Sequence, residues 1–497
     1  MENMRERITI RDNNQFEIKY TYPLQPEEKN TRYFVEMFLF IPQSLNINHK
    51  TYGKSNFYRD STNYIRFKTP DFTLPEIIDG DSSPIQKTRM AVKELITSPD
   101  SREAQENYNY HLKMFSSILK SALRDEEERL EKIIDCNELN QSVDVMVNTL
   151  SRIILEFRKL HNFDSFLSLE DRWKTLFALS DEYISIISEF HLFKVMELLS
   201  KKAETEKYAE SSTKLRNLIN SECSHRFSSG YPSIVRDNSD NETFLYRART
   251  LKKVMGSILF LHTQNYHDGK LAEQFMLSLA AGLAMAVAML IILLGQKIFG
   301  NIALCLGLGT VISYMIKDRT KESSRIWLSN WVKKHFFDYK TLIMDNLNRK
   351  IGECRSSISF LKQSAVPPDI MKIRNRDILA ELAGGSLREE VIYLRKQINL
   401  VNAECNKIWT DFRVEGLNDI VRFNLREIMN KMDKPERELY FLEGEKWGHT
   451  DSISVYHLNV ILRYGMAAKK IETRKIRLIV NRNGIRRIVE TDIGNIT

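Results

Sequence analysis

The chain has little that would identify it as an enzyme. It contains no glycine-rich phosphate loop ending in lysine and a hydroxyl residue, no HExxH or CxxC metal pattern, and no GxSxG nucleophile turn. The glycines from Gly300 to Gly309 lie inside an apolar run, which suits helix packing rather than phosphate binding. Catalytic and cofactor-binding residues therefore stay unassigned.

Cysteine is scarce and dispersed. The five cysteines are Cys136, Cys223, Cys305, Cys354 and Cys405. An odd, scattered set does not form a disulfide framework, and it predicts reduced thiols in a cytoplasmic setting. Cys223 with His225 is the nearest approach to a metal site, but structural zinc needs four closely spaced ligands. We therefore predict neither a metal nor a cofactor.

The first residues lack the apolar core of a signal peptide, because MENMRERITIRDNNQ is polar and charged. A membrane segment, if present, must direct its own insertion from further along the chain. The formal net charge of +8 is modest for 497 residues. It is compatible with an anionic membrane surface and selects no specific nucleic-acid partner.

What the chain does have is a pair of long apolar runs at its middle. Phe275–Leu294 and Ile298–Ile316 carry no charged residue and are separated by three residues only. Each run is near the ~20 residues that a helix needs to cross a hydrocarbon core of ~30 Å. We predict a transmembrane helical hairpin over 275–316. The alternatives are a buried hairpin in a soluble core, and a hairpin that dips into the membrane and returns without crossing.

Small residues recur at helical spacing within these runs. Ala280, Ala284 and Ala288 repeat every fourth residue in the first run, and Ala303 and Gly307 do so in the second. Small side chains let two helices approach closely in lipid, where apolar burial no longer drives association. These five residues are the predicted packing contacts of the hairpin.

Basic residues lie on both sides of the hairpin. They are Arg247, Arg249, Lys252, Lys253 and Lys270 before it, and Lys317, Arg319, Lys321, Arg325, Lys333 and Lys334 after it. Such charges mark the cytoplasmic side of a membrane. We therefore expect an integral protein of a bacterial inner membrane with both termini in the cytoplasm.

Aromatic and basic residues come together shortly after the second run. Trp327 and Trp331 lie close to Lys333 and Lys334, a combination typical of the membrane–water interface. An amphipathic helix packed on protein would give the same pattern. We keep the four residues as candidate interface anchors.

The two ends of the chain read as β. Apolar and polar residues alternate around a turn near residue 13, and Tyr33–Ile41 is apolar enough for a central strand. Near the other end, alternating runs flank Asn483-Gly484, a strong hairpin signal. Because isolated hairpins are marginally stable, we predict that the terminal regions 1–80 and 441–497 pack together in one sheet.

The segments between these ends read as helical. Spacings of three and four predict helices over 84–220, a membrane-approach helix over 242–274, and a second cytoplasmic helical region over 317–440. Ser83-Pro84 marks one helix start, and Tyr183–Leu199 is apolar nearly all round, like a buried helix. The apolar stripes fit either a helical bundle within the chain or a coiled coil.

Taken together, the pattern predicts an α+β membrane protein with a mostly helical body, a two-helix transmembrane hairpin and strand-rich N- and C-terminal regions. The predicted role is a membrane-anchored cytoplasmic scaffold or interaction protein without enzymatic activity. Its expected partners are the lipid bilayer and either a second copy or another protein. The alternatives are a membrane-tethered enzyme or ligand-responsive effector without a recognisable motif, and an oligomeric pore.

Overall fold

The computed structural model of the 497-residue chain divides into two compact units. The sheet unit comprises Met1–Ile65, Leu261–Lys407 and Gly416–Thr497, and the bundle unit comprises Arg66–Phe260 and Ile408–Glu415. The structure describes residues 4–25, 27–80, 82–162, 166, 169–202, 205–237, 239–299, 303–345, 348–375, 389–405, 412, 414–444, 446–466 and 471–491.

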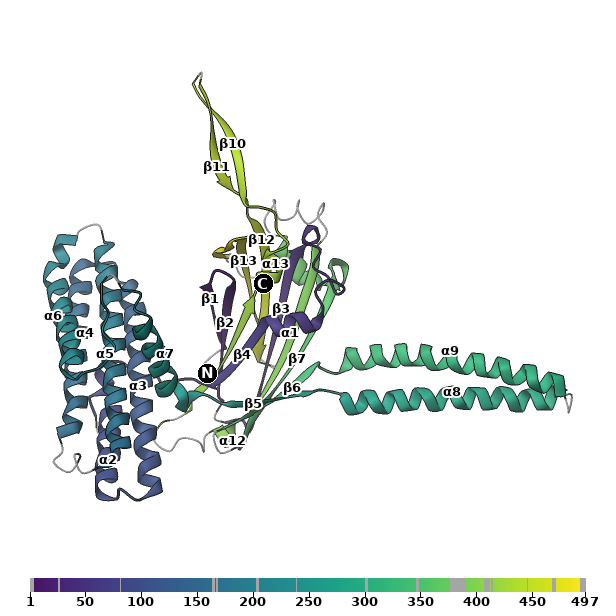
Figure 1. Ribbon diagram of the computed structural model, residues 1–497, viewed down its shortest axis with the longest axis horizontal. Coiled ribbons are helices and arrows are strands. Elements are labelled where there is room, and N and C mark those ends of the chain that lie inside the picture. The colour runs from purple at the N-terminus through teal and green to yellow at the C-terminus, as the bar shows by residue number, and fades with distance from the viewer. Residues whose placement is uncertain are drawn as a thin grey trace. The chain divides into compact units, whose positions relative to one another are not determined.

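The bundle unit consists of long helices that run side by side (Figure 1). They are α2 (Pro84–Thr97), α3 (Arg102–Glu131), α4 (Cys136–Lys159), α5 (Asp171–Ser200), α6 (Ala209–Ser228) and α7 (Glu242–Gly256). Helix α2 begins where the sequence indicated, with Ser83 as its N-cap and proline in its first turn. The apolar stripes of α3, α4 and α5 meet through Phe157, whose ring stacks on Phe115 at 5.1 Å and on Phe177 at 4.8 Å. The coiled-coil interpretation is therefore wrong, because these stripes are covered by other helices of the same chain.

The sheet unit contains two main antiparallel sheets and one separate ribbon. Its strands are β1 (Arg5–Asp12), β2 (Gln15–Pro23), β3 (Asn30–Pro42), β4 (Ser61–Phe67), β5 (His262–His267), β6 (Tyr339–Met344), β7 (Lys350–Lys362), β8 (Glu389–Val401), β9 (Gly416–Asn424), β10 (Glu436–Glu443), β11 (Lys446–Ile453), β12 (Tyr456–Met466), β13 (Ile471–Asn481) and β14 (Gly484–Thr491). The eight-stranded sheet has the order β14-β13-β12-β3-β8-β7-β6-β5, the four-stranded sheet β1-β2-β9-β4, and β10 and β11 pair only with each other.

Strands from the two ends of the chain are neighbours in the eight-stranded sheet. β12 pairs antiparallel with β3, which places Tyr464 opposite Val35. The expected terminal hairpins are also present as β1–β2 and β13–β14. Gly484 closes the second hairpin with a φ of +147°, in the left-handed region that favours glycine. The prediction that the terminal regions pack together is confirmed for β3 and β12 to β14, which share this sheet, whereas β1, β2 and β4 lie in the four-stranded sheet.

The core of the sheet unit lies between its two main sheets. The ring of Tyr20 on β2 meets Tyr464 on β12 edge-on at 6.3 Å, and Tyr22 lies 5.2 Å from Tyr33 on β3. On its other side, β3 carries Phe38 and Phe40 into a cluster completed by α10. Short helices join the strands: α1 (Lys54–Asp60), α10 (Pro368–Arg374), α12 (Asn402–Cys405) and α13 (Arg426–Met429), with 3-10 turns at Gln43–Leu45 and Gln363–Ala365. The bundle unit has 3-10 turns at Pro75–Ile77, Leu160–Asn162, Thr205–Tyr208 and Ser257–Leu259.

The expected mostly helical body is wrong, because much of the region after residue 335 is sheet. Strands β6 to β9 occupy segments in which the apolar spacing had indicated helices. In β8, Ile392, Leu394 and Ile398 share the buried face with Lys396. Because a lysine occupies one position of that face, the alternation of apolar and polar residues expected for a strand was interrupted. The spacing of the apolar residues alone then resembled that of a helix. The approach helix likewise ends at Gly256, and β5 follows it.

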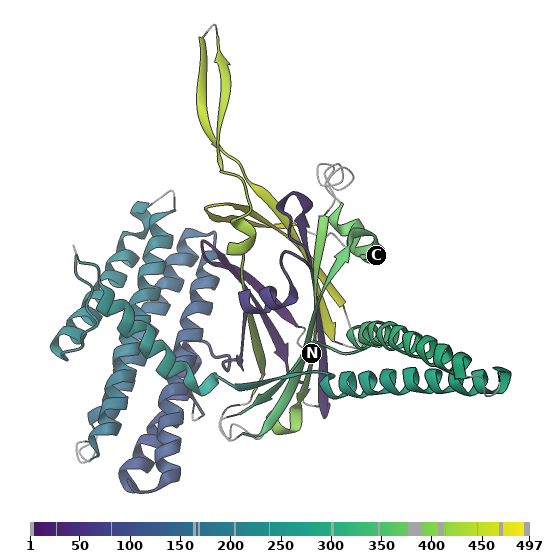
Figure 2. The ribbon, with the colours of Figure 1, turned by 45° about the vertical axis from the view of Figure 1, so that its right-hand side comes forward.

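The middle of the chain forms two antiparallel helices, α8 (Lys270–Phe299) and α9 (Ala303–His335), which Figures 1 and 2 show side by side. We call this pair the arm. Among the described residues, only one stretch, Gln274–Leu294 of α8, is long and apolar enough to cross a membrane. Charged residues enter α9 from Lys317 onward, too soon after Ala303 for a second span. The prediction of a two-span transmembrane hairpin is therefore wrong. One such stretch is compatible with membrane association and does not support an integral membrane protein.

Candidate functional site

The arm is built on a stripe of alanines along α8. Ala280, Ala284 and Ala288 are buried, although the helix around them is largely exposed. The Ser313 hydroxyl of α9 donates a hydrogen bond of 2.8 Å to the carbonyl oxygen of Ala288, which shows how closely the two helices approach. Small side chains allow this separation. The structure thus brings three of the predicted packing residues together at the α8–α9 contact.

The remaining faces of α8 carry large apolar side chains that are exposed within the described part of the chain. Only 17% of the apolar stretch Gln274–Leu294 is buried. A core helix of this composition would be mostly buried. The large side chains that are 44% to 67% exposed are Phe275, Leu279, Leu283, Met285, Met289, Leu290, Leu293 and Leu294. Contiguous apolar surface of this kind marks a contact with a membrane or with another protein.

Helix α9 changes character along its length. Val311, Tyr314 and Met315 are exposed apolar residues. From Lys317 onward the exposed or half-buried residues are mostly charged, and the Lys317 ammonium group lies 4.7 Å from the centre of the Tyr314 ring. The helices are antiparallel and Ser313 lies beside Ala288. The charged residues of α9 therefore lie alongside the first half of α8. The arm is therefore apolar toward its tip and charged toward its base.

The predicted interface residues lie on the charged half of α9. Trp327 is 67% exposed, next to the exposed Ile326. Trp331, Lys333 and Lys334 belong to α9, but their side chains lie outside the described residues, as do those of Ala303 and Gly307. The exposed apolar residues of α8 were not singled out from the sequence, since its apolar composition does not tell lipid-facing from buried positions.

No protein family, curated protein or solved structure matches the chain. Its function must therefore be argued from its own residues.

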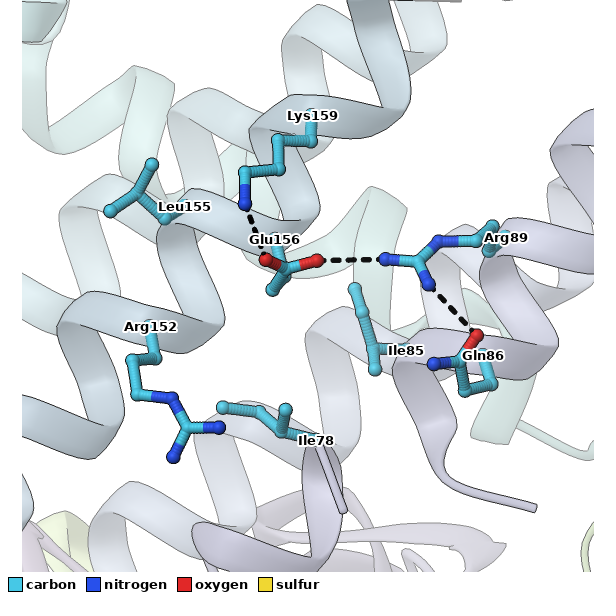
Figure 3. A pocket seen from close by; sticks show the side chains of 8 residues that line it. All are labelled: Ile78, Ile85, Gln86, Arg89, Arg152, Leu155, Glu156 and Lys159. Atoms are coloured by element: carbon cyan, nitrogen blue, oxygen red, sulfur yellow. Dashed lines mark hydrogen bonds and ion pairs between the residues drawn. The ribbon is translucent and has the colours of Figure 1, made fainter. Parts of the chain in front are cut away.

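A pocket of about 220 Å³ lies between α2 and α4 of the bundle unit (Figure 3). Glu156 accepts hydrogen bonds from Arg89 at 2.8 Å and from Lys159 at 2.6 Å. The third cation, Arg152, lies 3.9 Å from Asp79. Internal carboxylates thus balance most of the positive charge, and the pocket has no clear preference for an anionic ligand.

The core of the sheet unit holds a polar group that resembles catalytic chemistry. Lys396 on β8 donates to Asp419 on β9 at 2.5 Å, and the Tyr22 hydroxyl donates to the same carboxylate oxygen at 2.9 Å. Burial alone would lower the pKa of Lys396, but the adjacent Asp419 raises it. Lys396 is 4% exposed and Asp419 0%. A substrate cannot reach this group, so it serves to join the two sheets.

A second polar network lies among α4, α5 and α6 of the bundle unit. Asp181 accepts from Arg158 at 2.9 Å and from the Tyr231 hydroxyl at 3.0 Å, and it lies 2.7 Å from the His225 ring. Burial would raise the pKa of Asp181, but His225 and Arg158 hold it below its usual range. Within the described residues, no group of three or more His, Cys, Asp or Glu side chains could hold a metal.

Proposed function

We propose that this chain is a membrane-attached interaction protein whose arm dips into one face of a bilayer, while its two folded units stay outside and bind a partner. The observation that carries the proposal is the uncovered apolar surface of α8. The Lys396–Asp419 group is sealed and the Asp181 network is internally paired, which supports a binding role over a catalytic one.

The strands that flank the arm support an entry and a return on the same side. β5 leads into α8 and β6 follows α9, and the two strands pair directly, with His262 opposite Met344 and His267 opposite Tyr339. Both ends of the arm are therefore fixed to one sheet. A single crossing by α8 would separate these paired strands across the membrane.

The base of the arm has the composition of a membrane–water interface. Lys317, Arg319 and Arg325 accompany the first half of α8, and Trp327 is exposed among them. Aromatic and basic side chains favour the headgroup region. We therefore place Trp327, with Trp331, Lys333 and Lys334, at headgroup depth. The excess of basic residues near the arm supports a cytoplasmic location for the folded parts of the chain.

The energetics favour this arrangement. Fully burying a large apolar side chain stabilises by ~1.5–3 kcal/mol, so the half-exposed residues of α8 gain ~1 kcal/mol each on leaving water. Eight such residues contribute on the order of 8 kcal/mol, which exceeds the marginal, reversible binding that a single myristoyl chain provides. In water alone, the same surface would promote aggregation.

The test is flotation of the full-length protein with lipid vesicles after detergent removal. We expect the wild-type chain to float with the vesicles. The double variant Leu283→Asp with Leu290→Asp places two carboxylates in the apolar stretch Gln274–Leu294 of α8. Each carboxylate costs about 2.5–3.5 kcal/mol in a hydrocarbon setting. We expect it to remain with the unbound protein.

The matched control is Phe190→Asp with Phe193→Asp in α5, whose aromatic side chains are 56% and 47% exposed. This variant adds the same charge to another apolar helix and should float normally. If the α8 variant floats as well as the wild type, or if both variants fail equally, the membrane role of the arm is refuted.

A further inference from the structure

The ribbon formed by β10 and β11 is another part of the described structure with exposed apolar side chains. Its strands pair from Glu436 opposite Ile453 to Glu443 opposite Lys446, and they join neither main sheet. Every residue of β10 is exposed, and so are most residues of β11. Both views draw it as a separate two-stranded ribbon (Figures 1 and 2). An isolated pair of strands is marginally stable in water, so we expect another strand to pair with this ribbon and stabilise it.

The outer half of the ribbon is apolar. Leu439, Tyr440, Phe441 and Leu442 follow one another in β10 and are 47% to 77% exposed, and Trp447 on β11 is 73% exposed. Such side chains are typical of the centre of a protein interface. Acidic residues predominate on the ribbon, which carries Glu436, Glu438, Glu443 and Asp451 against Arg437 and Lys446. This balance disfavours an anionic lipid surface and favours a protein.

The sequence of β10 is complementary to itself when a second copy runs antiparallel. With Tyr440 opposite Tyr440 of the partner, Arg437 lies opposite Glu443 and Leu439 lies opposite Phe441. Alternation along a strand places Arg437, Leu439, Phe441 and Glu443 on one face. Each pairing occurs twice, as a two-fold axis requires. The result is two ion pairs outside two apolar pairs, a combination that stabilises neighbouring strands.

The other edge of the ribbon is less suited to the same pairing. β11 has Gly448 and His449 at its centre, and a side chain at Gly448 would meet the Phe441 ring at 2.9 Å. It therefore offers no central pair of large apolar residues. β10 has no glycine, and as an outer strand it presents backbone donors and acceptors along its free edge.

We propose that β10 pairs with β10 of a second copy, antiparallel about Tyr440, to form a four-stranded sheet from two ribbons. Pairing brings Leu439 and Phe441 of each copy, which are 52% and 47% exposed, beside those of the other copy. The apolar contact is therefore small, and the two ion pairs specify the register. The pairing names one partner of the protein. It does not depend on whether the arm enters a membrane.

The test uses the full chain in detergent, with its mass measured by sedimentation equilibrium. We expect a dimer for the wild type. Arg437→Glu places two acidic residues opposite each other, and Glu443→Arg places two basic residues opposite each other. Each variant should associate at least ~10-fold more weakly than the wild type. An equimolar mixture of the two variants restores both ion pairs and should dimerise again.

Oxidative crosslinking locates the contact independently of stability. Paired strands hold opposite Cα atoms about 4.5–5.5 Å apart, within the range of a disulfide. Tyr440→Cys chains should therefore crosslink to one another, whereas the Trp447→Cys control on β11 and the wild type should not. A monomeric wild type, a mixture that fails to dimerise, or equal crosslinking by both cysteine variants would overturn the proposal. Vesicle flotation of Arg437→Glu should be unchanged, so this failure is distinguishable from failure of the membrane role.

Discussion

Helices α5 and α8 are each 30 residues long, and each contains a mainly apolar run, Tyr183–Leu199 in α5 and Gln274–Leu294 in α8, yet they occupy opposite environments. Half of α5 is buried among neighbouring helices of the bundle. α8 buries three alanines against α9 and exposes its large side chains. Hydrophobic content alone therefore does not tell a core helix from a helix that seeks an outside partner.

The polar residues of the two helices distinguish them. α5 carries Asp181, Glu182 and Glu189 on buried faces, and each meets a cation from another helix. Glu182, for example, is fully buried and lies 2.8 Å from Arg247. Buried charges require such partners. The apolar stretch of α8 carries no charge, so a partner without polar groups, such as lipid, can cover it.

The largest loss of stability should come from removing the cation that pairs with a buried carboxylate of α5. Arg226 of α6 is 1% exposed, pairs with Glu189, and donates to the Ser185 hydroxyl at 2.8 Å. We expect Arg226→Leu to destabilise the bundle by about 3–5 kcal/mol, because Glu189 keeps its charge without the cation. Urea unfolding followed by far-ultraviolet circular dichroism measures this loss.

Two controls accompany that measurement. Arg216→Leu changes an exposed arginine of the same helix and should cost less than ~0.5 kcal/mol. Combining Arg226→Met with Glu189→Leu removes both charges and should recover most of the lost stability. Equal stability of Arg226→Leu and Arg216→Leu would show that the buried Arg226–Glu189 pair does not stabilise α5 in the bundle, and the proposed difference from α8 would fail.

One buried lysine of the bundle should make its stability depend on pH. Burial, with Lys252, Arg66 and Arg124 nearby, lowers the pKa of Lys120 on α3 to about 7. The unfolded chain holds this proton up to ~10.4, so it binds more protons than the folded chain between these values. Stability therefore rises as the pH increases from about 7 to about 10, and the full penalty applies below about 7.

Replacing Lys120 with methionine should abolish this rise and stabilise the bundle at about pH 6 by roughly 2–4 kcal/mol. Comparing urea midpoints at about pH 6 and about pH 9 tests the slope, with the exposed Lys132→Met as the control. A slope that survives in Lys120→Met would assign the pH dependence to another group.

The smallest effects should come from the arm itself. Ala284 is 0% exposed at the α8–α9 contact, so Ala284→Leu should separate the two helices at a cost of about 1–3 kcal/mol. Leu283 is half exposed, and Leu283→Ala should change stability by less than ~0.5 kcal/mol in the absence of a membrane. Hydrogen exchange of the arm amides should accelerate in the first variant only. Faster exchange in Leu283→Ala than in Ala284→Leu would mean that the alanines do not form the α8–α9 contact.

Local signals predicted those parts of the fold that depend on neighbouring residues. The turn at Gly484, the hairpin at the N-terminus and the helix start at Ser83-Pro84 each follow from chemistry within a few positions. Strand β8 escaped prediction because Lys396 occupies a buried position that only Asp419, on another strand, makes tolerable. No local pattern reveals such a partner.

The sequence indicated where along the chain the arm lies, but not that only one of its helices has an apolar stretch long enough to cross a membrane among the described residues. The alanine spacing identified the contact face of α8. The second apolar run misled, because its first two residues, Ile298 and Phe299, belong to α8. Helix α9 begins at Ala303, which leaves too few apolar residues before Lys317. The ribbon of β10 and β11 left a signal in the run Leu439–Leu442, flanked by charges. Its exposure depends on the absence of a third strand, which only the sheet order shows.

The most direct test of the membrane role labels α8 and α5 at equally exposed positions. An environment-sensitive fluorophore is attached through Met289→Cys, at a side chain 59% exposed, or through Phe190→Cys, at one 56% exposed, after the native cysteines are replaced. On transfer from detergent to vesicles that contain depth-resolved quenching lipids, the account predicts strong quenching from acyl-chain depth at Met289→Cys and none at Phe190→Cys. Equal quenching at both positions, or none at Met289→Cys, would contradict it.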